Sequence, residues 1–173
     1  MRARALHAAT LNAAPVNAAV ADRQRTASGW SSEGARLKGG RWNQPGTPAI
    51  YAATSYASAV LEILVHSTIG RVPRDFRYVT IDIPDDTRVD RVEPDAVPGW
   101  ETLPPRASCA FGDAWLRERE GLVLLVPSVV TGGLDLNAVV NPLHRAFDRI
   151  VAGLEQPVRW DPRLLPPATR TDR

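Results

Sequence analysis

The chain has 173 residues, of which 44% are hydrophobic and 23% are charged. A chain of this length can bury one sizeable core but not comfortably two, so we expect a single domain. The formal net charge is only +2, and the arginines are interspersed with acidic residues, which argues against a basic stripe for direct nucleic-acid binding.

The chain has a single cysteine, Cys109, so no internal disulfide can form. The three histidines, His7, His66 and His144, show no metal-ligand spacing, and we expect no metal and a reducing, cytoplasmic compartment. No apolar run approaches the ~20 residues that a membrane-spanning helix needs. The sequence therefore predicts no membrane association.

Residues 1–28 are rich in alanine, and we expect them to form a loosely ordered leader. They faintly imitate a secretion signal, but His7, Asn12 and Pro15 interrupt the apolar stretch, so a loosely ordered leader is the favoured interpretation. Serines and glycines over residues 29–40 then predict a polar loop that leads into Arg41.

The first clear strand is predicted over residues 49–53, which are short and apolar. Ser55 stands at a helix N-cap position before residues 56–66, whose apolar side chains cover most of the circumference and predict a buried helix. Residues 76–83 alternate with a period of two and predict a second strand.

Residues 88–105 are rich in proline and charge and predict a long surface excursion. Helical spacing returns over residues 108–118, with Gly121 as the expected C-cap. The apolar run 122–126 predicts a central strand, and further short strands are expected at 138–140, 150–154 and 158–160. Together these elements predict an α/β (α+β) fold.

One segment carries a specific motif. Gly39-Gly40-Arg41-Trp42-Asn43 is followed by Gly46, Pro48, Tyr51, Ser55, Ala59, Glu62 and His66. This pattern resembles the signature of RES domains, which are named for an arginine, a glutamate and a serine. Later positions follow the same order: Gly112, Trp115-Leu116, Val126-Pro127-Ser128, Asn141-Pro142, His144, Asp161 and Arg163. The resemblance covers residues 29–165 and leaves 166–173 as a C-terminal tail.

RES domains are similar in fold to ADP-ribosyltransferases, so the resemblance implies a compact domain with a split mixed sheet around an NAD cleft. It also implies the toxin of a type II toxin-antitoxin system, with an Xre-family antitoxin as partner. NAD would be the substrate, and no prosthetic group is expected. The family usually has an aromatic-arginine strand near its start, for which this chain offers only Arg2 or Arg4.

Cleavage of the nicotinamide-ribose bond develops positive charge on the ribose, so the site needs an anion anchor, an aromatic ring and a carboxylate. Arg41 is the candidate anchor, because its fork can bind phosphate or ribose oxygens; a surface ion pair is the alternative. Tyr51 could stack on nicotinamide, and a core tyrosine is an equal alternative. Glu62 lies among apolar neighbours, where a carboxylate is costly unless it is paired or used.

Ser128 follows the apolar strand, and we expect it to position the substrate through a hydrogen bond rather than to act as a nucleophile. Asn141 is a second-tier candidate beside the NAD cleft. The catalytic candidates are thus Arg41, Glu62 and Ser128, and the NAD contacts are these three with Tyr51 and Asn141.

Three functions are compatible with this site. The leading hypothesis is a toxin that depletes NAD, with water or phosphate as the attacking group. The second is transfer of ADP-ribose to a protein acceptor. The third, from a different class, is a catalytically silent binding module, against which the intact set of Arg41, Tyr51, Glu62 and Ser128 argues.

Overall fold

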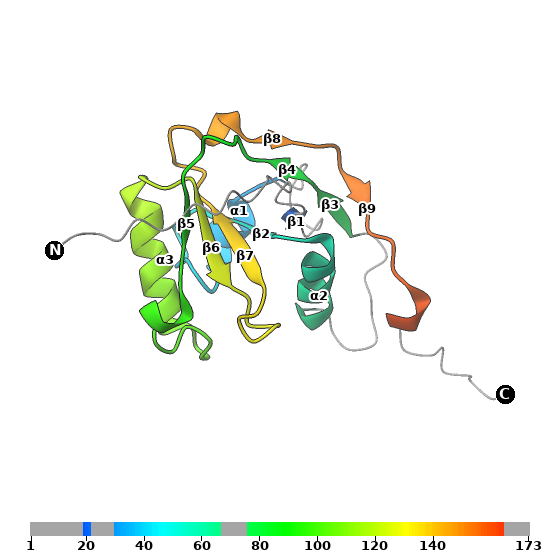
Figure 1. The fold of residues 1–173 in the computed structure, drawn as a ribbon, viewed down its shortest axis with the longest axis horizontal. Helices are drawn as coiled ribbons and strands as arrows, with labels where there is room; N and C mark the ends of the chain where they lie inside the picture. The colour runs from blue at the N-terminus through cyan, green and yellow to red at the C-terminus, as the bar shows by residue number, and fades with distance from the viewer. Residues whose placement is uncertain (1–18, 22–29, 67–75, 165–173) are drawn as a thin grey trace.

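The computed structural model describes residues 19–21, 30–66 and 76–164 (Figure 1). In chain order its elements are β1 (Ala19–Ala21), α1 (Glu33–Lys38), β2 (Ile50–Ala53), α2 (Tyr56–His66), β3 (Arg77–Val79), β4 (Ile81–Asp82), β5 (Val89–Arg91), the 3-10 turn η1 (Pro94–Ala96), α3 (Arg106–Glu118), β6 (Val123–Pro127), β7 (Leu136–Val140), η2 (Phe147–Arg149), β8 (Val151–Ala152), β9 (Gln156–Pro157) and η3 (Pro162–Leu164). Within the described ranges, none of the helices is long and apolar enough to cross a bilayer.

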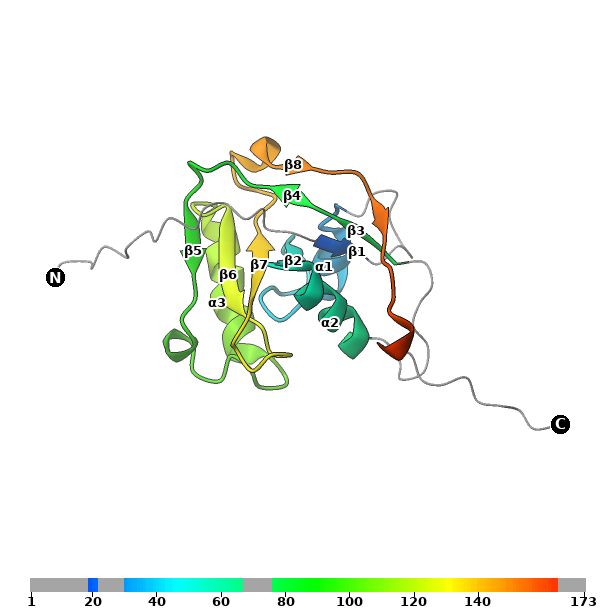
Figure 2. The same cartoon turned by 45° about the vertical axis from the view of Figure 1, so that its right-hand side comes forward.

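A four-stranded sheet with the order β2-β7-β6-β5 forms the centre of the fold. β6 pairs with β7 in antiparallel fashion and with β5 in parallel fashion, so the sheet is mixed. The remaining described strands form two smaller sheets, with the orders β1-β3-β9 and β4-β8. Figure 2 shows β3–β4 and β8–β9 running together as an arch beside the central sheet. The predicted split, mixed sheet of an α/β domain is confirmed.

Alternation along the central strands divides the core into two clusters. On one face, Ile50, Val123 and Val140 pack with Val79 and Ile81 of the smaller sheets. On the other face, Leu124, Val126 and Val139 pack with Trp42, Trp100 and Leu116 of α3. The central sheet is therefore covered on both sides, which explains why β2 and β6 are almost continuously apolar.

Two predicted loops contain regular structure. The segment expected to be a polar loop holds α1, whose Glu33 and Arg36 form an ion pair one turn apart. The predicted surface excursion holds the edge strand β5 and buries Val92, Val97 and Trp100. Both predictions were wrong, because isolated apolar residues among charges and prolines give no periodic signal, and long-range packing decides whether they are buried.

Helix α2 has the predicted bounds, and Ser55 caps it: the Ser58 N–H donates to Ser55 Oγ at 3.0 Å. The prediction that this helix is buried was wrong in part, because Leu61 and Val65 are exposed along one side. Gly121 is not the C-cap of α3; Arg119 takes the left-handed conformation there, with φ of 59°. Gly121 instead makes room for Trp115, whose ring would lie 2.4 Å from an added Cβ.

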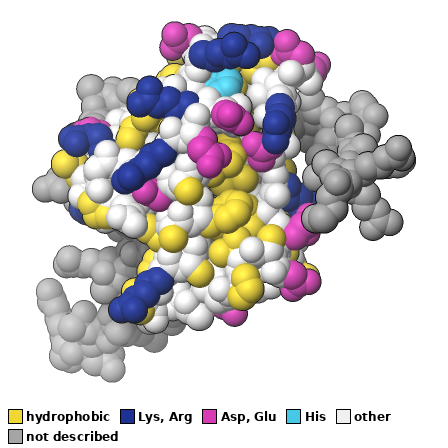
Figure 3. Space-filling view, turned by 90° about the vertical axis from the view of Figure 1, so that its left-hand side faces the viewer, with side chains coloured by type: hydrophobic (Ala, Val, Ile, Leu, Met, Phe, Trp, Pro, Cys, Tyr) yellow, Lys and Arg dark blue, Asp and Glu magenta, His cyan; other side chains and the backbone are white. Residues whose placement is uncertain are grey.

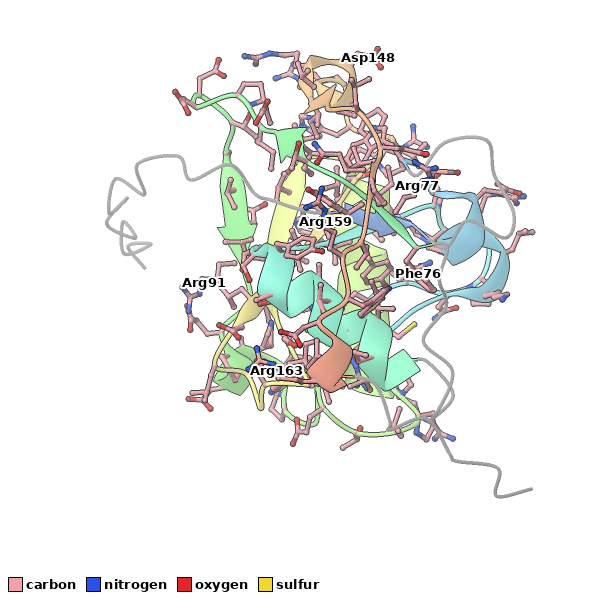
Figure 4. The ribbon with its side chains drawn as sticks, turned by 90° about the vertical axis from the view of Figure 1, so that its right-hand side faces the viewer. Phe76, Arg77, Arg91, Asp148, Arg159 and Arg163 are labelled. Atoms are coloured by element: carbon pink, nitrogen blue, oxygen red, sulfur yellow. The ribbon has the colours of Figure 1, made fainter. Side chains whose placement is uncertain are left out.

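The strand predicted over residues 76–83 is divided at Thr80 into β3 and β4, because it changes partner from β9 to β8. The last strand was predicted over residues 158–160, but β9 is Gln156–Pro157. The Val158 N–H adds one further hydrogen bond, to the Phe76 carbonyl. Beyond it the chain crosses α2 (Figure 4), where the Arg159 N–H donates to the Tyr56 hydroxyl.

The segment expected to be a loose leader contains a paired strand. β1 runs antiparallel to β3, with Val20 opposite Tyr78. It is the strand nearest the start of the described chain, whereas Arg2 and Arg4 and the predicted tail 166–173 lie outside the described residues.

Candidate active site

Two polar side chains from different parts of the fold converge on one carboxylate oxygen of Glu62. Ser128 Oγ donates to Glu62 Oε1 at 2.9 Å, and Asn137 Nδ2 donates to the same oxygen at 2.7 Å. Glu62 and Asn137 are half-buried, and Ser128 is 2% exposed. Two donated bonds hold the carboxylate in one orientation and leave its negative charge partly shielded from solvent.

The fold explains how these residues meet. Asn137 lies near the start of β7, where the ladders place it opposite Ala53 of β2 and Val126 of β6. Ala53 packs against Ala59 of α2, and Glu62 lies one turn after Ala59 on the same side of the helix. The short packing contact therefore brings the Glu62 carboxylate over the end of the sheet, where β6 ends and Ser128 begins the next turn.

Arg41 lies beside a different loop. Its Nη1 donates to the Trp100 carbonyl at 2.9 Å and to the Thr102 carbonyl at 3.1 Å. Among the described residues it forms no ion pair, so the surface ion pair that was the alternative is not observed. A guanidinium has five N–H donors, so three remain on Nε and Nη2 for an anionic ligand.

Tyr51 positions the segment that carries Arg41. Its hydroxyl donates to Asn43 Oδ1 at 2.7 Å and accepts from the Trp42 N–H at 2.9 Å. Burial raises the pKa of Tyr51 well above its ordinary value, so the phenol keeps its proton. The hydroxyl is thus committed to protein partners, while stacking of its ring on nicotinamide stays a prediction.

The two glycines before Arg41 serve this packing. A Cβ on Gly40 would lie 2.6 Å from the Tyr51 hydroxyl oxygen, and a Cβ on Gly39, at φ 72°, would lie 2.9 Å from Pro45. Glycines at such positions can let a ligand approach the backbone. The space is filled by the protein instead, because Tyr51 closes over the backbone at this point.

Tyr51 and Asn137 lie on the same face of the central sheet. Tyr51 is opposite Val139, and Asn137 precedes Val139 by two residues, so the two side chains are diagonal neighbours across the ladder. The aromatic ring and the Glu62 cluster therefore belong to one side of the sheet, the side on which Trp42 and Trp100 also pack.

Asn141 is placed at the other end of this sheet. Its backbone N–H donates to the Leu122 carbonyl, which precedes β6, whereas Ser128 follows β6, so about 20 Å of extended chain separates the two ends. Its Nδ2 donates to the Leu116 carbonyl and its Oδ1 accepts from the Leu143 N–H. The amide of Asn141 joins α3 to the end of β7, away from the Glu62 cluster, and its contact with NAD stays a prediction.

A cavity of ≈ 570 Å³ also lies at this opposite end, lined by residues that include Arg88, His144, Arg145 and Arg149. Arg88 pairs with Asp90 and Arg149 with Asp86, so two of its three arginines are neutralised by neighbours. On the face formed by α3 and β5, side chains of both charges surround a central apolar area (Figure 3). That face carries no continuous basic stripe.

Two site residues were missed by the sequence reasoning. Asn137 precedes an apolar run and carries no motif of its own, so only the ladder to Ala53 reveals its place beside Glu62. Asn43 belongs to the motif at residues 39–43, and its role is structural. It is 1% exposed, and its Nδ2 donates to the carbonyls of Ala35 and Thr47, which fixes the turn before β2.

The fold and this cluster define an α/β protein with a carboxylate held by serine and asparagine at the end of a split sheet. Comparison with known proteins agrees: the family model for the RES domain matches residues 15–161. The chain therefore belongs to the RES-domain family. The matched region begins before residue 29, where we had expected the domain to start, and includes β1.

Curated relatives carry toxin names. The chain is 36% identical to "Toxin Res" of Photorhabdus laumondii over 72% of this chain and 80% of that protein. It is 36% identical to the "Prs ADP-ribosylating toxin" of a Sphingobium species, over 78% of this chain and 86% of that protein. Among solved structures, the M. tuberculosis MbcT-MbcA toxin-antitoxin complex contains a similar chain, with a TM-score of 0.56 and 25% identity over 80% of this chain and 81% of that chain.

Proposed function

We propose that this RES-domain protein is the toxin of a toxin-antitoxin pair, and that it acts in the cytoplasm by cleaving NAD at the bond between nicotinamide and ribose. The observation that carries the proposal is the Glu62 carboxylate held by Ser128 and Asn137. A fixed negative charge beside the ribose would stabilise the cation that develops as the bond breaks. The names of the curated relatives support the toxin assignment.

In the proposed reaction the C1″–N1 bond between the ribose and nicotinamide breaks, and its electron pair neutralises the pyridinium nitrogen of the departing nicotinamide. An oxygen of water or of inorganic phosphate then bonds to C1″ and loses its proton, which gives ADP-ribose or its 1″-phosphate. Glu62 faces the ribose, and Ser128 holds Glu62. The free donors of Arg41 would bind the diphosphate of NAD.

The test is release of nicotinamide from NAD by the purified protein, in buffers with and without phosphate. The wild type is expected to release nicotinamide, and Glu62→Gln is expected to be slower by ~10²-fold or more, because it keeps the shape of the side chain and loses the charge. Glu33→Gln is the matched control, since Glu33 pairs with Arg36 on the surface of α1. Dependence on phosphate would distinguish phosphorolysis from hydrolysis. A folded wild type that leaves NAD intact in every buffer would refute cleavage and favour the silent binding module.

A second candidate, transfer of ADP-ribose to a protein, is favoured by one observation. One relative that covers most of this chain is named an ADP-ribosylating toxin of Prs. The same site would serve, with a nucleophilic side chain of the acceptor replacing water. Labelled NAD incubated with the toxin and a host lysate distinguishes the two activities, because transfer leaves the label on protein and hydrolysis leaves it on free ADP-ribose.

The antitoxin partner follows from the same comparisons, since the similar solved chain comes from a toxin-antitoxin complex. We propose an Xre-family antitoxin that covers the Glu62 cluster or its entrance. Expression of the wild type alone should arrest growth of a bacterial host, and co-expression of the antitoxin should restore it. An antitoxin interface mapped wholly to the end of the sheet around Asn141 would contradict occlusion of the site.

A further inference from the structure

One buried polar atom beside Glu62 has no hydrogen-bond partner among the described residues. The Oδ1 atom of Asn137 is buried from solvent, and it accepts no hydrogen bond from any described group. Its Nδ2 is fixed by the 2.7 Å bond to Glu62, so the amide cannot turn over without placing oxygen against the carboxylate. The orientation of Oδ1 is therefore set by Glu62.

An unsatisfied buried amide oxygen is unfavourable, and such atoms are few in native proteins. Rotation cannot relieve this one, and its ladder partners Ala53 and Val126 have no side-chain donor. This buried acceptor has no partner in the described part of the chain and lies next to the carboxylate of the site, so a substrate with an N–H donor would satisfy it.

The surroundings favour a flat amide as that substrate group. Tyr51 is the diagonal neighbour of Asn137 on the same face of the sheet, so its aromatic ring lies on the side of the sheet that carries Asn137. A neutral amide oxygen matches a neutral amide N–H, whereas the charged Glu62 oxygen is the stronger acceptor for ribose hydroxyls.

We infer that Asn137 has two roles: Nδ2 positions Glu62, and Oδ1 accepts a hydrogen bond from the carboxamide N–H of nicotinamide. This inference rests on the proposed function and adds the residue that recognises the leaving group. The Glu62 carboxylate by itself does not distinguish one leaving group from another, and Asn137 adds recognition of the nicotinamide carboxamide.

The test compares NAD with its 3-acetylpyridine analogue, in which a methyl group replaces the amide –NH₂ and the carbonyl is kept. The two substrates also differ in leaving-group reactivity, so the quantity measured is the ratio of their kcat/KM values in each variant. Loss of one hydrogen bond corresponds to about a tenfold change. In Asn137→Ala the preference for NAD over the analogue should therefore fall about tenfold from its wild-type value.

A second variant separates the two roles. Asn137→Asp keeps an acceptor toward the substrate and replaces the donor to Glu62 by a carboxyl group. Two carboxyl groups at this distance share a proton at low pH, and that proton can restore a bond to Glu62. We expect Asn137→Asp to retain preference for NAD, and to lose kcat as the pH rises and the shared proton leaves. A merely structural role for Asn137 would not move the pH profile in this way.

Thr54→Val is the matched control. Thr54 Oγ1 donates to the carbonyl of Leu136, next to Asn137, so its loss perturbs the same end of the sheet without touching the amide. It should keep the wild-type preference. Thermal unfolding checks that each variant is folded, and if Asn137→Ala is not, the pH profile of Asn137→Asp decides.

The outcomes separate the two levels of the proposal. If the wild type cleaves NAD and Asn137→Ala keeps the same preference, or Asn137→Asp keeps a wild-type pH profile, the role of Asn137 is refuted and the proposed function stands. If the wild type releases no nicotinamide from either substrate, the proposed function fails and the role of Asn137 fails with it.

Discussion

Ser128 and Glu62 are 66 positions apart in the chain, and their side chains meet through a 2.9 Å hydrogen bond. Neither residue is held by its own element alone. Glu62 is presented by the packing of α2 on β2, and Ser128 by the end of β6, so the site exists only when both are docked on the central sheet.

This bond makes Ser128 testable as a positioning residue. Ser128→Ala removes one donor from the carboxylate, and bonds to charged groups are worth about 1.5–3 kcal/mol, so kcat for nicotinamide release should fall by about 10- to 100-fold. KM for NAD should change little. Ser108→Ala is the control, because Ser108 is equally buried in α3. A Ser128→Ala enzyme with wild-type kcat would show that Asn137 alone is sufficient to hold Glu62.

Arg41 is expected to act on binding. Arg41→Lys keeps the charge but cannot hold both the Trp100 and Thr102 carbonyls while presenting a planar fork. KM for NAD should rise about tenfold or more, with a smaller change in kcat, since one charge-assisted bond is worth about 1.5–3 kcal/mol. Arg36→Lys, on exposed α1, should leave both constants unchanged. A tenfold fall in kcat with an unchanged KM would instead place Arg41 at the reacting centre.

Gly40 is expected to be intolerant of any side chain. A Cβ in Gly40→Ala would lie 2.6 Å from the Tyr51 hydroxyl oxygen, and such overpacking lowers the free energy of unfolding by about 1–3 kcal/mol. Gly34→Ala is the control, because no atom lies within 4 Å of its Cβ and it is helical; there we expect a gain of about 0.5–1 kcal/mol. Denaturant unfolding measures both. If Gly40→Ala had the same free energy of unfolding as the wild type, Tyr51 would be able to move away from the added Cβ at little cost.

The raised pKa of Tyr51 makes the free energy of unfolding depend on pH in the alkaline range. Burial raises its pKa in the folded state, so between the ordinary pKa of 10.0 and the folded value the unfolded chain loses the proton first. The stability due to this group is complete below pH 10 and is lost as the pH rises further. The free energy of unfolding should therefore fall above about pH 10.

The comparison is with Tyr51→Phe. This variant should be less stable at neutral pH by about 1–3 kcal/mol, because Asn43 Oδ1 loses its donor, and its stability should depend less steeply on alkaline pH. Parallel pH profiles for the two proteins would show that Tyr51 does not titrate with unfolding.

Local sequence determined the parts of this protein whose signals lie within a few residues. The period of residues 56–66 and the cap at Ser55 predicted α2, and the apolar run before Pro127 predicted the central strand β6. The motif around Arg41, Glu62 and Ser128 pointed to the family, which the match over residues 15–161 confirmed. These features depend on propensity and spacing, which are properties of the chain itself.

Tertiary structure decided what depends on distant contacts. β5 forms because β6 offers it a parallel partner, and Val92 and Trp100 are buried because the core reaches them. Asn137 bonds to Glu62 whereas Asn141 bonds to the Leu116 carbonyl, although the two asparagines lie at opposite ends of one strand. The register of β7 between β2 and β6 made that difference, because it places one end of the strand beside Glu62 and the other beside α3.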